Sequence, residues 1–453
     1  MLRLLYTLLM HLAVPAILVR LWWRGRTESG YRRFIGERFG GTDEGGGRGN
    51  SNTASIWIHA VSVGEVRAAM PLIAGLRAAH PESRVVLTCM TPTGRRTARD
   101  LLTSSVSVCY LPYDLPWALA RFIHRWQPMM MIVMETELWP NLLAACQARK
   151  VPAFLANARL SERSRRGYAR FAPICALASS AFGRFSAVMA QSPADAERLK
   201  SLGANNVVVT GNVKFDLVID PAMLALGATW RAPVAAIERP VLLLASTREH
   251  EEMALVDAFQ RVFMKQRDVE KNGQENVPES AARIQLLLVV VPRHPSRCDD
   301  VDARIRSTGL RVARRSALAT ATEGAPVDVD VWLGDSMGEM QAYYAMCDIA
   351  VIGGSFQPLG GQNLIEAAAL GKPVIMGPST FNFAEAVRLA RAAEAMISVP
   401  DAEAAMQASL KLLADDARLQ SLAANARRFA AGHGGATEKT LVIIRETIAK
   451  TKH

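Results

Sequence analysis

The stretch IWIHAVSVGEVRAAMPLI, Ile56–Ile73, joins an apolar strand pattern to an amphipathic helix pattern through a short polar turn. A short, continuous apolar run is typical of a strand that is buried on both faces, as in a parallel sheet. Glu65 stands at the junction, and the nearby sequence offers no obvious partner for its charge. We therefore predict a parallel α/β fold with Glu65 at the carboxyl end of its first strand, either as a helix cap or as a functional acid.

The alternation of strand and helix continues through the chain in two series. The first extends to about Asn212, the second begins near Pro240, and the segment between them, 215–238, carries prolines and little strand signal. Alternation of this kind predicts two doubly wound, Rossmann-like domains in tandem. Ligands of such domains bind at the carboxyl ends of the strands, so we expect the two domains to face a cleft.

Composition limits the class of protein and its partners. Half of the 453 residues are hydrophobic, which excludes a disordered chain, and the formal net charge is +11, which favours anionic partners. No nucleic-acid motif or aromatic platform accompanies the charge, so we expect no nucleic acid. The six cysteines follow no CxxC or metal-ligand spacing and are interpreted as reduced thiols in the cytosol.

The N-terminus predicts a membrane anchor. Leu4–Trp23 is about as long as a helix that crosses a bilayer, although His11, Pro15 and Arg20 interrupt it. Arginines follow it where a signal peptide would have a small-residue cleavage site, and they favour keeping the following chain on the cytoplasmic side. We assign residues 1–38 to the anchor, either spanning or lying in the membrane, and the glycine-rich residues 39–55 to a flexible tether.

Polar residues in the first series gather where strands end. Glu65 follows the first strand, Glu135 and Glu137 follow a later one, and Lys214 lies in GNVKFD near the end of the series. Packing does not explain acids at this edge, whereas a functional site does. Arg95 and Arg96 are also expected at this edge, and the arginine-rich segment 157–171 is either a solvated basic helix or a docking surface for anionic headgroups.

In the second series, AVIGGSFQPLGGQNLIEAAALGKPVIMGP, Ala350–Pro378, predicts a cradle for a phosphate and a ribose. Its glycines permit close backbone approach, and a helix is expected to open at about Gln362 or Asn363, with a phosphate at its N-terminus. Glu366 is expected either to bind ribose hydroxyls or only to stabilise that helix. Other strand-end candidates are Arg293, the segment 336–339, and Ser246 with Thr247 and Arg248.

These motifs resemble those of the 3-deoxy-D-manno-octulosonic acid (Kdo) transferases of Gram-negative bacteria. The resemblance runs through HAVSVGE, METELWPN, NARLSERS, GNVKFD, PRHPSR, GDSMGE and GGSFQPLGGQNLIEAAALGKPVI in order. It implies a GT-B glycosyltransferase of α/β class with an N-terminal membrane-anchoring helix. It further implies an inverting, metal-independent enzyme without a cofactor, which moves Kdo from CMP-Kdo onto lipid IVA in lipopolysaccharide synthesis.

The resemblance also assigns domains and residues. Residues 56–225 would be the acceptor-binding domain and residues 226–453 the CMP-Kdo-binding domain, on the cytoplasmic side of the inner membrane, beside anionic lipids. Glu65 would be the general base, and Glu135 and Lys214 would stabilise the transition state. The CMP contacts would fall on Pro292, Arg293, Met337, Gly338, Glu339, Asn363, Leu364, Ile365 and Glu366.

We expect the Glu65 carboxyl to keep a pKa near its free value of about 4.3 and so to be ionised at neutral pH. Three alternatives stay open at this point. They are a GT-B glycosyltransferase that uses a UDP-sugar, a nucleotide-sugar epimerase of the same shape, and a non-catalytic, membrane-tethered protein that binds nucleotides or nucleic acid.

Overall fold

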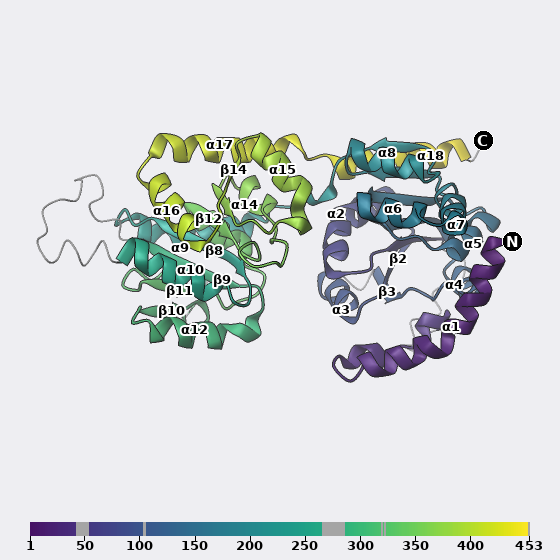
Figure 1. Cartoon of the computed structure of the whole chain (residues 1–453), viewed down its shortest axis with the longest axis horizontal. Helices are drawn as coiled ribbons and strands as arrows, with labels where there is room; N and C mark the ends of the chain where they lie inside the picture. Colours follow the sequence, from purple (N-terminus) through teal and green to yellow (C-terminus); the bar gives the residue numbers. More distant parts are fainter. Residues whose placement is uncertain (42–53, 103–105, 265–285, 319, 321–322, 452–453) are drawn as a thin grey trace, which may run out of the picture. The chain divides into compact units, whose positions relative to one another are not determined.

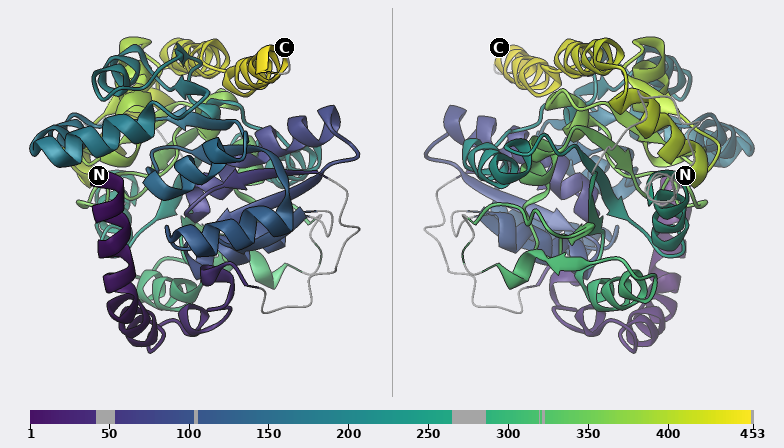
Figure 2. Two further views of the ribbon diagram at one scale, coloured as in Figure 1. Left: turned by 90° about the vertical axis from the view of Figure 1, so that its right-hand side faces the viewer. Right: turned by 90° about the vertical axis from the view of Figure 1, so that its left-hand side faces the viewer.

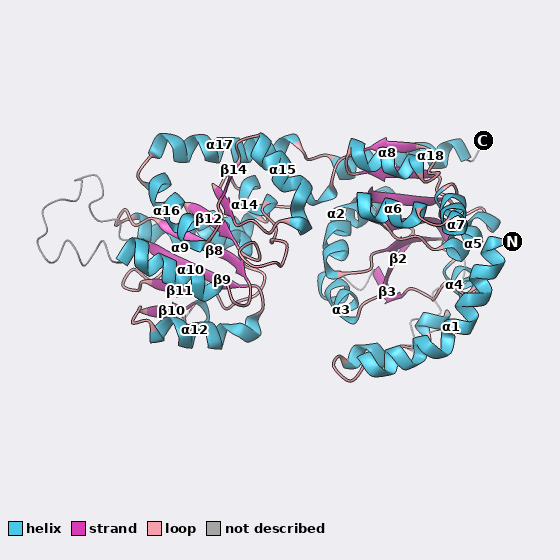
Figure 3. Ribbon diagram, in the orientation of Figure 1, coloured by secondary structure: helices cyan, strands magenta, loops and turns pink. Residues whose placement is uncertain are grey.

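The computed structural model describes residues 1–41, 54–102, 106–264, 286–318, 320 and 323–451 (Figure 1). The chain divides into two compact units, the first made of Met1–Asp216 with His433–His453, and the second of Leu217–Gly432. Each unit contains a seven-stranded sheet whose strands all run parallel, with α-helices between most consecutive strands (Figure 3). The predicted pair of doubly wound domains is therefore present.

The sheet of the first unit has the strand order β3-β2-β1-β4-β5-β6-β7. The order reverses between β1 and β4, and this reversal is the point at which doubly wound sheets bind ligands. Its strands are β1 (Ser55–His59), β2 (Arg84–Cys89), β3 (Val106–Tyr110), β4 (Pro128–Met134), β5 (Ala153–Ala158), β6 (Ala187–Ala190) and β7 (Val207–Val209).

Helices cover both faces of this sheet because alternate strand residues point to opposite sides. On one face, Trp57 and Met131 pack with α4 (Pro116–Trp126), α5 (Pro140–Ala148), α7 (Ala172–Phe182) and α8 (Pro193–Ser201). On the other, Ile58 and Ile132 pack with α2 (Val63–Ala79), α3 (Pro92–Leu101) and α18 (Ala436–Thr451). The helices α2, α3, α8 and α6 (Glu162–Ala169) each begin after a serine or threonine whose hydroxyl accepts a backbone N–H.

The sheet of the second unit has the order β10-β11-β9-β8-β12-β13-β14 and reverses between β8 and β12. On one face, α9 (Pro221–Ala235) and α13 (Met340–Met346) meet through Trp230 and Tyr343, whose ring centroids lie 4.9 Å apart. The strands are β8 (Val241–Thr247), β9 (Leu287–Pro292), β10 (Val312–Arg314), β11 (Val331–Leu333), β12 (Ile349–Ile352), β13 (Val374–Met376) and β14 (Met396–Ser398). The other helices are α10 (Glu252–Phe259), α12 (Cys298–Ser307), α14 (Ile365–Ala369), α15 (Ala384–Ala392), α16 (Ala402–Leu413) and α17 (Asp416–Gly432).

The boundaries of the units differ from the expected ones. The first unit ends at Asp216 instead of residue 225, because α9 packs on α13 of the second unit. The last helix, α18, belongs to the first unit, although residues 226–453 were expected to form one domain. A Cβ on Gly75 of α2 would lie only 2.4 Å from Leu441 Cδ1, so glycine lets α18 approach α2 closely. Sequence pattern predicts a helix here but does not encode which sheet it covers.

The N-terminal segment is docked on the first unit before the expected tether begins. After α1 (Leu2–Arg24), the short helix η2 (Glu37–Phe39) carries the buried Glu37, whose carboxylate pairs with Arg95 at 2.7 Å and accepts the Tyr110 N–H at 2.9 Å. Arg95 is thus a structural partner of this segment and not a cation of the sheet edge. The tether prediction falls largely on residues 42–53, which lie outside the described residues. The polar sequence at 266–282 predicts a solvated loop or a helix extension, and it too lies outside the described residues, within 265–285.

Candidate active site

Glu65 occupies the first turn of α2, at the carboxyl edge of the first sheet. The Val61 N–H donates to Glu65 Oε2 at 2.8 Å, and the Ser62 hydroxyl donates to Oε1 at 3.0 Å. The Ser62 oxygen also accepts the Glu65 N–H at 3.5 Å. This arrangement is a capping box, so Glu65 does cap helix α2. The same contacts hold the carboxylate in one position, which a general base also needs.

The environment of Glu65 gives it the pKa of a general base. Burial raises the pKa of its carboxyl to about 7, with further increases from the negative charges of Glu135 and Glu137, while the Val61 N–H and Ser62 act in the opposite direction. The expectation of an ordinary pKa is therefore wrong, because it considered only the helix N-terminus. A base with a pKa near the working pH is the most effective one for proton transfer.

Glu135 and Lys214 form an ion pair at the same edge. Lys214 Nζ lies 3.2 Å from Glu135 Oε1, and each side chain is about a quarter exposed. Glu135 follows β4 with a left-handed φ of 56°, and its N–H donates to the Ala156 carbonyl at 2.9 Å. A left-handed glutamate is strained, and such strain is tolerated most often at functional sites.

Two asparagines that sequence reasoning did not single out position Lys214. The buried Asn157, at the end of β5, accepts the Val213 N–H at 3.1 Å, and Asn212 accepts the Lys214 N–H at 3.0 Å. Asn157 belongs to the quoted motif NARLSERS, but nothing in that motif indicates its contact with a loop 56 residues later. Glu65, Glu135, Glu137 and Lys214 are therefore brought together by β1, β4 and the loop after β7.

In the second unit, a buried acid organises the edge at the strand-order reversal. Glu251 is fully buried after β8, and its carboxylate accepts the backbone N–H groups of Arg248, at 2.7 Å, and of Gly354 and Phe356 in the glycine loop. It therefore joins the loop after β8 to the loop after β12. A Cβ on Gly353 would lie 2.6 Å from both the Ser246 carbonyl oxygen and Thr247 Cα, so this close approach requires glycine.

Arg293 follows β9 within a cluster of cations. Its N–H donates to the Thr247 carbonyl at 2.9 Å, and its side chain is half-buried. Partial burial, together with the charges of Arg248, Arg293 and Arg297, lowers the pKa of the His294 imidazole. The guanidinium groups of Arg248 and Arg293 therefore contribute to one positive field beside the end of β9, of the kind that attracts a phosphate.

The segment 336–339 forms a turn before α13. Gly338 has a φ of 85°, Met337 is 63% exposed, and Glu339 pairs with the buried Arg315 at 3.0 Å while the Ser336 hydroxyl donates to it. Arg315 was not predicted, since it lies in a short helical turn without a recognisable motif. The turn presents exposed backbone and the Met337 side chain, and its acid is held by Arg315.

The expected helix of the ribose cradle begins later than predicted. It starts at Ile365 and contains five residues, because the Asn363 carboxamide accepts the Ile365 N–H at 3.0 Å and so ends the preceding turn. The Asn363 amide donates to Glu366 Oε1 at 2.9 Å, which orients both side chains. Leu364, Ile365 and Pro292 are buried, so at this edge Asn363 and Glu366, which are partly exposed, present the groups that a ligand can reach. So short a helix has a weak dipole, and the cradle depends on its side chains and loop amides.

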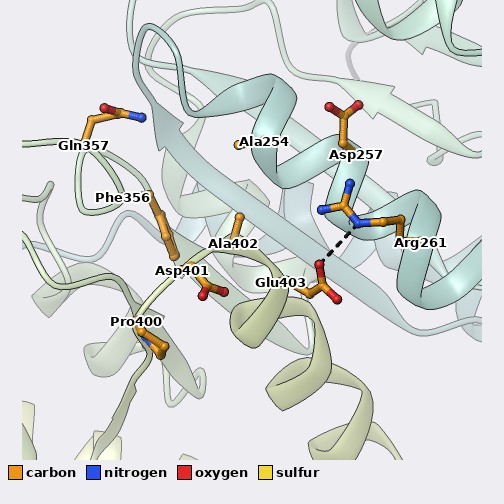
Figure 4. A pocket seen from close by; sticks show the side chains of 9 residues that line it. All are labelled: Ala254, Asp257, Arg261, Phe356, Gln357, Pro400, Asp401, Ala402 and Glu403. Carbon is orange, nitrogen blue, oxygen red and sulfur yellow. Dashed lines mark hydrogen bonds and ion pairs between the residues drawn. The ribbon is translucent and has the colours of Figure 1, made fainter.

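A separate pocket of about 500 Å³ lies in the second unit (Figure 4). It lies where α10, the loop after β12 and the start of α16 meet, and an Arg261–Glu403 ion pair of 3.3 Å crosses its wall. Its lining is Ala254, Asp257, Arg261, Phe356, Gln357, Pro400, Asp401, Ala402 and Glu403, which includes no predicted site residue. Within the described part of the chain, no cluster of three or more histidine, cysteine, aspartate or glutamate side chains is placed to hold a metal.

Comparison with known proteins shows which families this chain resembles. Residues 33–217 match the family model of 3-deoxy-D-manno-octulosonic-acid transferase (kdotransferase), and residues 249–429 match that of glycosyl transferases group 1. A 3-deoxy-D-manno-octulosonic acid transferase of Bordetella pertussis is 41% identical over 96% of this chain and 97% of its own length. One of Haemophilus influenzae is 33% identical over 91% of this chain and 90% of its own length.

Among solved structures, a UDP-GlcNAc 2-epimerase of Neisseria meningitidis bound to UDP-GlcNAc has a TM-score of 0.53 at 16% identity, covering 87% of this chain and all of its own. At this identity the likeness concerns the fold alone. Together with the two parallel sheets and the group 1 match, it confirms the predicted GT-B architecture.

Proposed function

Because this chain belongs to the Kdo transferase family, we propose that it transfers Kdo from CMP-Kdo to lipid IVA, a phosphorylated glucosamine disaccharide. Membership makes it a glycosyltransferase of Kdo, and the choice of donor and acceptor is our proposal. The observation that carries it is the Glu65 carboxyl, held by Val61 and Ser62 at the edge of the first sheet with a pKa of about 7.

In the proposed reaction, Glu65 removes the proton from the acceptor hydroxyl as its oxygen attacks the anomeric carbon of Kdo. The bond from that carbon to the CMP phosphate oxygen breaks on the opposite face, and CMP leaves with the electron pair, so the configuration inverts. A positioned base of this kind typically contributes 100-fold to 10,000-fold in rate. Glu137, whose pKa is raised chiefly by burial, lies near enough to keep the Glu65 pKa high.

We assign Lys214 and Glu135 to the stabilisation of charge in the transition state. Kdo carries a carboxylate, so an ammonium that is pinned by Glu135 at 3.2 Å and by the Asn212 cap is placed to offset negative charge. Because both partners are only a quarter exposed, their field is less screened than that of a surface pair.

For the donor, we propose that Arg293, with Arg248 beside it, neutralises the phosphate of CMP without a metal. The backbone of 337–339 would contact the nucleotide, and the buried Pro292, Leu364 and Ile365 would support the site from beneath. Glu366, oriented by Asn363 at 2.9 Å, would accept hydroxyl groups of the ribose. Glu366→Ala is expected to weaken CMP binding and to leave membrane attachment unchanged.

The 23-residue helix α1 is apolar enough to enter a membrane, and with the family it indicates membrane association. We propose the cytoplasmic side of the inner membrane, because arginines follow the helix and CMP-Kdo is a soluble, charged donor. Exposed arginines of α6 and its flanks, Arg163, Arg166 and Arg170, would then face anionic headgroups.

The test is to incubate the full chain with CMP-Kdo and lipid IVA in vesicles and to measure the mass of the lipid product. A mass increase of one or more Kdo units supports the proposal, and an unmodified lipid refutes it. Parallel titrations with CMP and UDP distinguish a transferase that uses a UDP-sugar, since that enzyme would bind UDP more tightly. Glu65→Gln, which should bind CMP normally and transfer less than a tenth as fast, separates catalysis from mere nucleotide binding.

A further inference from the structure

Helix α1 lies against its own domain through one partly buried face, on which Leu21 is the fully buried residue. The less exposed positions recur every three or four residues, which places them on one face of a helix. They are Leu2, Tyr6, Thr7, Met10, Ala13, Val14, Ile17 and Leu21. The opposite face is apolar and open, with exposed fractions of 54–69% at Leu4, Leu5, Leu8, Leu9, Leu12, Val19, Trp22 and Trp23. The left view of Figure 2 shows the helix, in dark purple, along the outside of the first unit.

Polar contacts near the N-terminal end of α1 fix this packing. The Thr7 hydroxyl donates to Asn141 Oδ1 at 2.9 Å, and the Tyr6 side chain lies beside the buried Asp114, whose carboxylate accepts the N–H groups of Asn141 and Leu142. The helix contacts both α5 and α7, and its ribbon bends about midway (Figure 1). The helix contains Pro15, a residue that commonly bends helices.

A perpendicular, membrane-spanning α1 is incompatible with these contacts. At 1.5 Å per residue, Tyr6 would lie about 27 Å from Arg24 along the membrane normal, within or beyond the hydrocarbon layer. The domain that carries Asp114 and Asn141 would remain outside the bilayer. Spanning would therefore break both contacts and leave the Asp114 carboxylate without the Tyr6 hydroxyl.

The C-terminal end of α1 carries cations around aromatic side chains. The Arg26 guanidinium lies 4.5 Å from the Trp22 ring centroid, and Arg32 donates to the Trp22 carbonyl at 2.9 and 3.1 Å. Arg24 lies over the Tyr31 ring at 5.2 Å. Tryptophan and tyrosine favour the headgroup region of a bilayer, and arginines beside them complement the phosphates of anionic lipids.

We infer that α1 lies in the plane of an anionic membrane surface, with its open apolar face in the lipid and its packed face on the first unit. The inference rests on the membrane attachment in the proposed function and specifies its geometry. The neighbouring helix α7 adds exposed apolar side chains, Phe171 and Ile174. The occupant of this surface is the bilayer, because an apolar stripe with an arginine and tryptophan end matches lipid chains and anionic headgroups.

Depth measurement by spin labels tests the orientation of the helix. In the full chain with Cys109→Ser and Cys175→Ser, single cysteines at Leu5, Leu12 and Val19 would carry nitroxides, bound to vesicles of phosphatidylethanolamine and phosphatidylglycerol at 3:1. An in-plane helix places all three labels at similar shallow depths, within about 5 Å. A spanning helix separates the labels at 5 and 19 by about 21 Å along the normal, with the label at 12 near the bilayer centre, and that result would overturn the inference.

Two further measurements keep the outcome unambiguous. Replacing Arg24 and Arg26 with glutamine should weaken vesicle binding by about 25-fold, at about 5-fold for each arginine, whereas Arg77→Gln on α2 should not. Spin–spin broadening with labels inaccessible to both oxygen and lipid quenchers would show that a second copy covers the face, and would refute a lipid occupant. Failure to bind vesicles would refute the membrane part of the proposed function itself, independently of the transfer assay.

Discussion

The pH dependence of transfer is the most direct test of Glu65 as the general base. Burial and two neighbouring carboxylates raise its pKa to about 7, so its basic form should be about one-tenth populated at pH 6 and nearly fully populated at pH 8. We therefore expect kcat/KM for donor transfer to rise about 10-fold between pH 6 and pH 8. A carboxyl with an ordinary pKa would be ionised throughout this range and would give a flat profile.

Initial rates at subsaturating CMP-Kdo, measured from pH 5.5 to 9 with the lipid product quantified by mass, provide the assay. Glu137→Gln should move the rise to lower pH, because Glu137 is one of the two charges that raise the Glu65 pKa. Glu82→Gln, an exposed substitution before β2, is the matched control and should leave the midpoint unchanged. A profile that changes less than 2-fold between pH 6 and pH 8 would refute the reasoning.

The same titration has a signature in stability. A carboxyl whose pKa is raised by folding binds more protons in the native state, so the free energy of unfolding falls as pH rises from about 4.5 to about 7. The loss is at most about 3 kcal/mol, and less because Glu65 is partly exposed to solvent. Urea denaturation of the wild type and Glu65→Gln at pH 5 and pH 8 should show this pH-dependent difference between them; a constant difference would contradict the raised pKa.

Three further predictions concern the other groups. Arg293→Ala should weaken CMP binding, measured by calorimetry, about 10-fold to 100-fold, since hydrogen bonds to charged groups contribute about 1.5–3 kcal/mol. The exposed substitution Arg304→Ala is the control and should not change the affinity; equal affinity of the two variants would exclude Arg293 from the phosphate site. Lys214→Ala should lower kcat with little change in donor affinity, and the double variant with Glu135→Ala should lose less kcat than the two single losses combined. Additive losses would show that the 3.2 Å ion pair is unimportant. Glu251→Gln should raise the KM for the donor and lower the melting temperature, because the Glu251 carboxylate holds the glycine loop. A normal KM in a destabilised variant would limit Glu251 to a structural role.

The fold was predictable because its signals are local. Apolar runs with helical segments between them specify a parallel sheet, and short loops with right-handed crossovers limit the order of its strands. The three-residue strand β10 was not predicted, since RVARR has neither the length nor the composition of a buried strand. The return of α18 to the first unit was also missed, because it depends on the complementarity of Leu441 and Gly75 and not on any local pattern.

The site was predictable in part. Motif positions placed Glu65, Glu135 and Lys214 at one sheet edge, and the structure brings them together. The pKa of Glu65 was not predictable, because it depends on burial and on acids that lie about 70 residues away in sequence. Glu251 and Arg315 were not predicted for a related reason, since each acts through a contact with a distant loop. Glu251 stands in the motif ASTREHEE, but nothing in that motif indicates its contact with the glycine loop, and Arg315 stands in no recognisable motif.

The return of the C-terminus has a consequence for the modularity of this chain. Both termini belong to the first unit, so the second unit is an insertion whose entry and exit points are joined by Asp216, which accepts the Gly435 N–H at 2.6 Å and also that of Thr437. Residues 217–432 could therefore be exchanged as a cassette, with splice sites at 216/217 and 432/433, without disturbing the base or the membrane helix. Chimeras built at these two sites would reveal whether donor choice travels with the cassette while acceptor choice stays with its host.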